Sequence, residues 1–230
     1  MLAGESKVFI GLGGNFAAAT PDTRLTQQAL SNCNLTVNIA TKLNRTHLTY
    51  GKESLILPCL GRTDIDMQVA GPQSVTVEDS FSMVHASAGV VAADISEMRS
   101  EPAIVAGIAE ATLGKQPVDW CWVVEDYGRI RDLIAKSIPG FSDFNQKITQ
   151  PGGFYLGNSA AQRQWHTASK KAQFMSHDLP THLMPANLRA LSQDPVLVLQ
   201  TMRSHDQYNT TVYGFNDRYR GISGERKVLF

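Results

Sequence analysis

The sequence contains little cysteine, little charge and no long apolar run. Its three cysteines, Cys33, Cys59 and Cys121, include no Cys-x-x-Cys pair, which argues against a zinc or iron–sulfur site within this chain. Charged residues make up 18%, and 21 Lys and Arg balance 21 Asp and Glu, so neither nucleic acid nor an anionic membrane is indicated as a partner. No apolar stretch is long enough to span a bilayer. The sparse cysteines and the lack of a signal peptide favour a cytoplasmic location.

An apolar share of 43% is enough for a buried core, and the first core element is expected at residues 8–10. This apolar run leads into Gly11, Gly13 and Gly14, and Thr20-Pro-Asp-Thr23 and an amphipathic segment up to Leu30 follow. The pattern predicts a buried strand, a tight glycine turn and a helix, and such a turn lets a phosphate approach the backbone. Phe16 stands where a dinucleotide-binding fingerprint has a small residue, so a turn that binds nothing remains the alternative.

Two further strands are predicted at residues 35–40 and 54–57, the second ending at Pro58. Strand, helix, strand and strand in this order indicate the α/β class, with a doubly wound, Rossmann-like parallel sheet. Ligands of such sheets bind at the carboxyl ends of the strands. Here those ends are residues 11–15, 41–46 and 59–66.

The middle of the chain is expected to leave this pattern and then return to helix. Residues 69–87 predict an irregular excursion that carries a small hairpin. Ser100 is a suitable N-cap for a helix that Gly114 ends. Residues 119–137 carry apolar side chains at near-helical spacing and predict one helix packed on the sheet.

Three charged residues, Arg62, Asp64 and Asp66, follow the third predicted strand. We expect a salt-linked loop there, with a paired-carboxylate acid–base role as the alternative. His47 and His85 are interpreted as structural. No catalytic or metal-binding residue is assigned within the chain.

A second composition begins after Pro180, where residues 196–199 predict a buried strand followed by a densely polar stretch. That stretch suits a polyanionic ligand rich in hydrogen-bonding groups, and Arg203 is placed to clamp a phosphate or a pterin carbonyl. A solvated turn is the alternative. The neighbouring Ser204, His205 and Asp206 cannot form a catalytic triad, because adjacent side chains diverge. Residues 227–230 also predict a strand, and this strand leads us to expect that the sequence is part of a longer protein.

Several long stretches resemble the large subunits of the molybdopterin oxidoreductases, the dimethyl sulfoxide reductase superfamily, and most of all its formate-dehydrogenase-like alpha subunits. Their order is kept, and together they cover essentially the whole chain. They are Phe9-Ile-Gly-Leu-Gly-Gly-Asn-Phe16, Thr20-Pro-Asp-Thr23, Thr41-Lys-Leu-Asn-Arg-Thr-His-Leu48, Leu57-Pro-Cys-Leu-Gly-Arg62, Val75-Thr-Val-Glu-Asp-Ser80, Met83-Val-His-Ala-Ser87, Val124-Glu-Asp-Tyr127, Arg203-Ser-His-Asp-Gln-Tyr-Asn-Thr-Thr211 and Asn216-Asp-Arg-Tyr-Arg-Gly221.

The resemblance implies a cofactor-binding part of a molybdenum-dependent oxidoreductase. Residues 1–171 would be its α/β domain for molybdopterin guanine dinucleotide, and residues 172–230 the start of a β-barrel of the double-psi type. The cofactor would be bis-molybdopterin guanine dinucleotide with molybdenum or tungsten. A [4Fe–4S] cluster would belong to a preceding part of the parent chain. The reaction would be a two-electron conversion of a small substrate such as formate, with an electron-transfer partner, and we expect the isolated chain to be inactive.

The resemblance also implies site residues in both parts. Gly13, Gly14 and Asn15 would lie beside the phosphates or ribose of the dinucleotide. The family's Asp after the second strand appears here as Ala40 or Thr41, and Asn44 falls where a family Thr contacts the dinucleotide. Glu101 falls where a family Asp reads guanine, whose N1–H and N2–H are adjacent donors. The pterins and their phosphates would be contacted by Arg203, Ser204, Gln207, Tyr208 and Asn209.

Two alternatives from other classes remain open. The first is a stand-alone module whose glycine turn binds an adenine dinucleotide. The second is a non-catalytic scaffold domain. A preference for NAD over GDP would favour the first of these alternatives.

Overall fold

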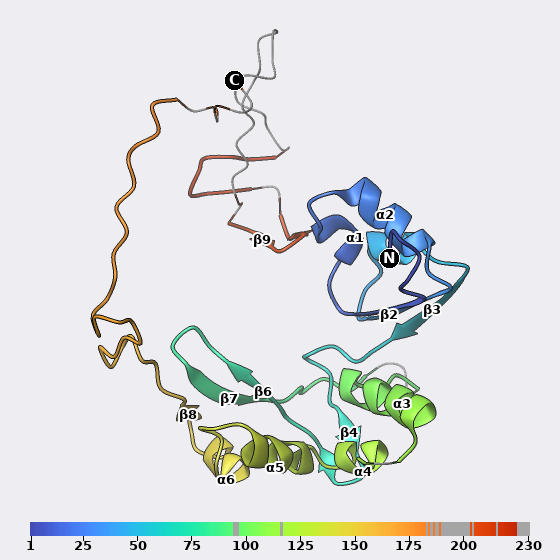
Figure 1. Ribbon diagram of the computed structural model, residues 1–230. Helices are drawn as coiled ribbons and strands as arrows, with labels where there is room; N and C mark the ends of the chain where they lie inside the picture. Colours follow the sequence, from blue (N-terminus) through green and yellow to red (C-terminus); the bar gives the residue numbers. More distant parts are fainter. Residues whose placement is uncertain are drawn as a thin grey trace. The chain divides into compact units, whose positions relative to one another are not determined.

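The structure is a computed structural model that describes residues 1–93, 97–115, 117–182, 184, 186, 189, 203, 205–214 and 216–224. The chain divides into two compact units, Met1–Gln162 and Arg163–Phe230 (Figure 1). The predicted domain boundary at residues 171 and 172 stays a prediction.

The first unit contains the predicted parallel sheet. Its three strands are β1 (Val8–Leu12), β2 (Leu35–Ala40) and β3 (Glu53–Pro58), in the order β1-β2-β3. The central strand β2 is buried along most of its length, as expected for a parallel strand with neighbours on both sides. The α/β class and the parallel sheet are therefore confirmed.

The first strand is not buried, which corrects the prediction made from its apolar run. β1 lies at one side of the sheet and pairs with β2 alone among the described residues. Val8, Ile10 and Leu12, which alternate along β1 and so share one face of the sheet, are each about half exposed. The apolar run thus predicted the strand correctly, but it did not show whether other residues cover the strand.

The amphipathic segment predicted as a helix up to Leu30 is helical, and a short additional helix lies between it and the glycine turn. Helix α1 (Phe16–Ala19) is a single turn, and α2 (Thr23–Ser31) begins after Asp22, whose carboxylate accepts from the Leu25 amide at 2.9 Å. The Phe16 ring packs on Phe9, with 5.1 Å between the ring centroids. Phe16 therefore fills space beside the sheet, and the two helices are separate because Thr20, directly before Pro21, has an extended backbone.

Helix α3 (Glu101–Leu113) agrees with the predicted boundaries. The Ser100 side chain caps its first turn, and Gly114, with φ of 73°, follows its last residue. Ile104 and Ile108 of this helix pack against the buried cluster formed by Val37 and Ile39 of β2 and by Cys59. This packing joins α3 to one face of the parallel sheet.

The single helix predicted at residues 119–137 is instead two helices, α4 (Trp120–Val124) and α5 (Tyr127–Ser137). Asp126 begins the second one and accepts from the Gly128 amide at 2.7 Å. Nor does α5 pack on the parallel sheet, because its Ile134 and Ala135 pack against a separate cluster. That cluster includes residues of α6 (Phe144–Ile148), a helix that the sequence did not predict.

The excursion between the sheet and α3 is built from short antiparallel strands. A two-residue pair joins β4 (Met67–Gln68) to β5 (Gly71–Pro72). The predicted hairpin is formed by β6 (Val75–Glu78) and β7 (Met83–Ser87), and β8 (Phe154–Tyr155) adds to its edge.

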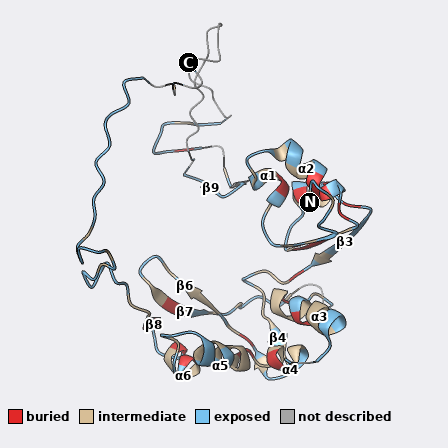
Figure 2. Ribbon diagram, viewed as in Figure 1, coloured by how far each residue is buried: buried red, intermediate tan, exposed pale blue. Residues whose placement is uncertain are grey.

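The described part of the second unit contains one antiparallel pair, β9 (Gln207–Tyr208) with β10 (Thr211–Val212), which is consistent with the start of a barrel. Residues 163–182 are largely exposed (Figure 2). The strands predicted at 196–199 and 227–230, and the site residue Ser204, lie outside the described residues. Within the described ranges, every helix is too short or too polar to cross a lipid bilayer.

Candidate functional site

The glycine turn lies at the carboxyl end of β1, beside the end of β2. The Gly13 amide donates to the Ile39 carbonyl at 2.8 Å. Gly13 and Gly14 have φ of 63° and 66°, a left-handed backbone that glycine adopts without the strain of a side chain. The turn is therefore fixed to the sheet, and its shape depends on two glycines.

Asn44 holds this turn from the segment that follows β2. Its Nδ2 donates to the Gly14 carbonyl at 2.7 Å, while its Oδ1 accepts from the Thr46 amide at 2.9 Å. The Asn44 amide in turn donates to His47 Nδ1 at 3.0 Å, which completes the cap of the short helix η1 (Arg45–Leu48). Asn44 thus has a structural role beside Gly14, and its contact with a dinucleotide stays a prediction.

Glu101 is brought to the same turn by α3, whose first residue it is. A Cβ placed on Gly13 would lie 3.8 Å from Glu101 Oε1. The Glu101 carboxylate also lies near the Cys59 thiol, and burial together with this negative charge raises the pKa of Cys59 to about 11. Burial and this negative charge therefore favour the protonated thiol of Cys59.

A cavity of about 450 Å³ lies between the ends of β2 and β3, the N-terminus of α3 and the hairpin. Thr41 and Glu101, both predicted site residues, line it. Its volume is within the range of small-molecule sites. The other lining residues are Leu60, Gly61, Arg62, Asp64, Asp66, Gln73, Val75, Val77, Ser87, Gly89, Ser100 and Pro102.

The loop after β3 lines this cavity, but it is not salt-linked as predicted. Asp64 accepts from the Gly61 amide at 2.7 Å, and Arg62 Nε donates to Ser87 Oγ at 3.1 Å. Asp66 is bound by the side chain of Gln68 at 2.6 Å and by the hydroxyl of Tyr127. Each charged side chain is therefore held by neutral partners, because the segment folds back on the hairpin and on α5.

Tyr127 was not predicted as a part of this site. Its hydroxyl is buried between Asp66 and Ser100, and burial, followed by the hydrogen bond to Asp66, raises its pKa strongly. Asp66 and Tyr127 are 61 positions apart, so no local periodicity could have revealed their contact.

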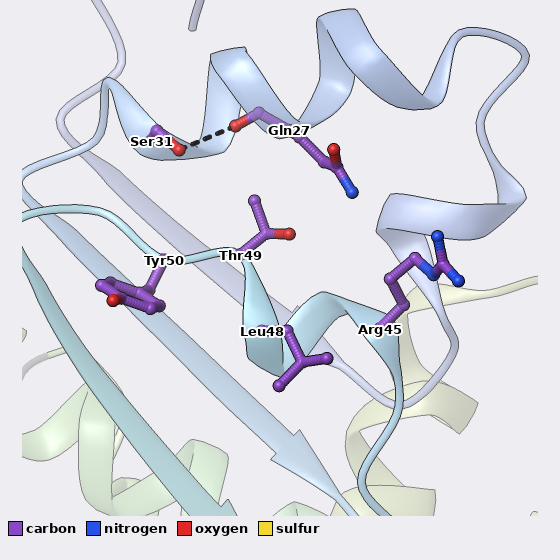
Figure 3. Close-up of a pocket in the computed structure, with 6 residues that line it drawn as sticks. All are labelled: Gln27, Ser31, Arg45, Leu48, Thr49 and Tyr50. Carbon is purple, nitrogen blue, oxygen red and sulfur yellow. Dashed lines mark hydrogen bonds between the residues drawn. The ribbon is translucent and has the colours of Figure 1, made fainter.

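A second cavity, of about 560 Å³, lies between α2 and η1 (Figure 3). It is lined by Gln27, Ser31, Arg45, Leu48, Thr49 and Tyr50. None of these is a predicted site residue, and Leu48 and Tyr50 are 80% and 60% exposed. With a single charged group on an open surface, this cavity is the weaker candidate.

The described site residues of the second unit lie in and around one hairpin. Gln207 and Tyr208 form β9, and Gln207 Nε2 donates to the Asn209 carbonyl at 2.9 Å. Asn209 has φ of 51° in the turn, and Arg203 is exposed. Their contacts with pterins stay a prediction.

Asp217 organises this part of the second unit and was not predicted as a site residue. It is 3% exposed and accepts from the His205 amide at 3.1 Å and from Arg220 Nη1 at 2.8 Å. Burial alone would raise the pKa of Asp217, but the hydrogen bonds from His205 and Arg220 lower it overall. Asp217 therefore joins the segment before β9 to the turn at residues 217–222.

Among the described residues, no group of three or more His, Cys, Asp or Glu side chains is arranged to hold a metal ion.

Comparison with known proteins gives relatives that are considerably longer than this chain. Protein YdeP of Escherichia coli K12 is 49% identical over 233 residues, and the uncharacterized oxidoreductase Rv2900c of Mycobacterium tuberculosis is 47% identical over 232 residues. These matches cover 99% and 100% of the chain, but the chain spans only 29% of the length of each relative. No family model matches the chain. The chain thus corresponds to part of proteins that include named oxidoreductases.

Proposed function

We propose that the chain is the cofactor-binding part of a molybdopterin-dependent, formate-dehydrogenase-like oxidoreductase. Its ligand would be bis-molybdopterin guanine dinucleotide with molybdenum or tungsten. The similarity to proteins named oxidoreductase supports the general class. The convergence of Gly13, Thr41 and Glu101 on the carboxyl edge of the parallel sheet supports the choice of a nucleotide.

Glu101 provides the observation on which this proposal depends. A carboxylate accepts two hydrogen bonds side by side, as the N1–H and N2–H of guanine require. Gly13 leaves open the space next to this carboxylate, and nothing lies within 4 Å of a Cβ placed on Gly14. The residues therefore fit a guanine nucleotide, with the carboxylate facing the base and the glycine backbone open to phosphate or ribose.

When bound, the metal–dithiolene group would supply the two-electron chemistry with a small substrate, and the protein would supply binding and orientation. In the first unit, Glu101 would fix the base, Thr41 would line its cavity and Asn44 would keep the glycine turn in shape. In the second unit, Arg203, Gln207, Tyr208 and Asn209 would bind phosphate and pterin groups. Electrons would leave through a partner outside this chain.

Calorimetric titration of the chain with GDP and with NAD tests the proposal. We expect GDP to bind more tightly, and Glu101→Gln to weaken GDP binding by about tenfold or more, since a charged acceptor is lost. Glu53→Gln is the matched control, because Glu53 begins β3 at the opposite end of the sheet. A preference for NAD, or an unchanged affinity of the Glu101→Gln variant, would contradict the proposal and favour a stand-alone dinucleotide-binding module.

A further inference from the structure

Tyr127 contacts three residues that line the 450 Å³ cavity, although it is not a lining residue itself. Its amide donates to Gln73 Oε1 at 2.8 Å. Its hydroxyl donates to Asp66 and lies 2.8 Å from Ser100 Oγ. Asp66 and Gln73 flank the β4–β5 pair, where the Gln73 amide donates to the Asp66 carbonyl at 2.8 Å, whereas Ser100 lies at the start of α3. Tyr127 therefore joins two parts of the cavity wall, the β4–β5 segment and the start of α3.

The partners of these groups determine where the protons lie. The Asp66 carboxylate accepts, so the one hydroxyl hydrogen of Tyr127 is directed to it. The Ser100 hydroxyl then donates to Tyr127 Oη, and Ser100 Oγ accepts from Gln68 Nε2 at 3.4 Å. Removing the Tyr127 hydroxyl would leave Asp66 with one donor fewer and Ser100 without its acceptor.

Ser100 connects this network to the proposed guanine contact. It is the N-cap of α3, is 5% exposed and directly precedes Glu101. On its other side, the Arg99 carbonyl accepts from the Leu60 amide at 3.0 Å. The start of α3 is therefore held from two directions, by the end of β3 and by the buried Tyr127 hydroxyl.

We propose that Tyr127 is a positioning residue that gives this site its selectivity for guanine. By holding Ser100, it fixes the direction in which Glu101 leaves α3, so that both carboxylate oxygens can meet N1–H and N2–H together. Bidentate recognition requires this geometry, whereas a single hydrogen bond tolerates a small rotation. The inference rests on the proposed role of Glu101.

Inosine diphosphate, which is GDP without the 2-amino group, is the probe for this selectivity. We expect the wild-type chain to bind GDP about tenfold more tightly than inosine diphosphate. In Tyr127→Phe, the preference for GDP over inosine diphosphate should fall to about threefold or less. The affinity for GDP should fall, whereas the affinity for inosine diphosphate should change much less. Tyr155→Phe is the matched control, since Tyr155 is 49% exposed in β8. Ser100→Ala removes the same hydrogen bond between Tyr127 and Ser100 from its other end. It is the second test variant if circular dichroism shows that Tyr127→Phe does not fold.

The outcomes separate the two proposals. A wild-type chain that binds both nucleotides equally overturns the role of Glu101 and, with it, this inference. A folded Tyr127→Phe or Ser100→Ala variant that retains the wild-type ratio overturns the inference alone. An equal loss of affinity for both nucleotides would show that Tyr127 has a purely structural role, and this result would also contradict the inference.

Discussion

At the scale of single residues, the site combines positions that a sequence can reveal with positions that it cannot. Gly13 was identifiable because a left-handed turn after a strand favours glycine. Glu101 was predicted through a family resemblance, and the structure brings its carboxylate close to Gly13. Tyr127 and Asp217 were missed as site residues because their roles come from burial and from contacts between distant segments. The sequence alone does not show which distant residue a buried polar or aromatic side chain will contact in the folded chain.

Replacing Gly13 with alanine is expected to impair both the fold and the site. Its φ of 63° makes any side chain unfavourable, and the new Cβ would lie 3.8 Å from Glu101 Oε1. The free energy of unfolding should fall by about 1 kcal/mol, and GDP affinity should fall as well. Gly4→Ala is the control, since Gly4 has φ of 72° and no atom within 4 Å of its Cβ position.

Urea denaturation and calorimetric titration measure these two effects. Gly4→Ala should show a comparable loss of stability with unchanged GDP binding. Equal GDP affinities for the two variants would contradict the placement of Gly13 beside the nucleotide.

At the scale of secondary structure elements, the sequence predicted the elements whose boundaries are local. The three parallel strands, the caps of α3 and the hairpin at residues 75–87 agree with their patterns. Where tertiary contacts divide a segment, the prediction was wrong. The segment 119–137 became two helices because Asp126 caps α5 and the Tyr127 amide, at the first residue of α5, binds Gln73. A continuous apolar spacing cannot show such a break.

The hairpin of β6 and β7 is expected to lose stability in acid. Asp79 accepts from His85 Nε2 at 2.8 Å and from the Met83 amide at 3.1 Å, and these hydrogen bonds lower its pKa below the ordinary value of 3.8. A carboxyl whose pKa is lower in the folded state stabilises the fold above its unfolded pKa. That stabilisation is lost as the pH falls below about 3.8 and through the folded pKa.

Asp79→Asn should therefore reduce the stability of the hairpin at neutral pH. The further loss of hairpin stability in acid should be smaller in this variant than in the wild type. Hydrogen exchange at the β6 and β7 amides, followed as a function of pH, measures this change. Asp178→Asn, in the exposed segment 163–182, is the control and should behave like the wild type. A decline in acid that is as steep in Asp79→Asn as in the wild type would show that another group is responsible.

At the scale of the whole molecule, the first unit leaves apolar surface on the sheet face that α3 partly covers. By register, Ile10 lies beside Val37, which lies beside Leu55, all on one face. Ile104 and Ile108 cover the centre of this face, whereas Ile10 and Leu55 at its sides are 50% and 52% exposed. Parallel sheets are normally covered on both faces. The prediction of a buried first strand was wrong for this reason: an apolar pattern shows that a cover is needed, but not that the described residues of the first unit supply it.

The 230-residue chain is therefore expected to self-associate and to bind a hydrophobic dye such as ANS, as exposed apolar patches do. Ile10→Lys should reduce both effects and change the free energy of unfolding by less than about 1 kcal/mol, since the side chain is already half exposed. Val69→Lys is the matched control because Val69, 81% exposed, lies outside the sheet. Light scattering over a range of concentrations and dye fluorescence measure the outcome. If the wild-type chain stays monomeric and binds no dye, the sheet face is not an interaction surface. The additional residues of the longer relatives would then not be expected to pack on this face.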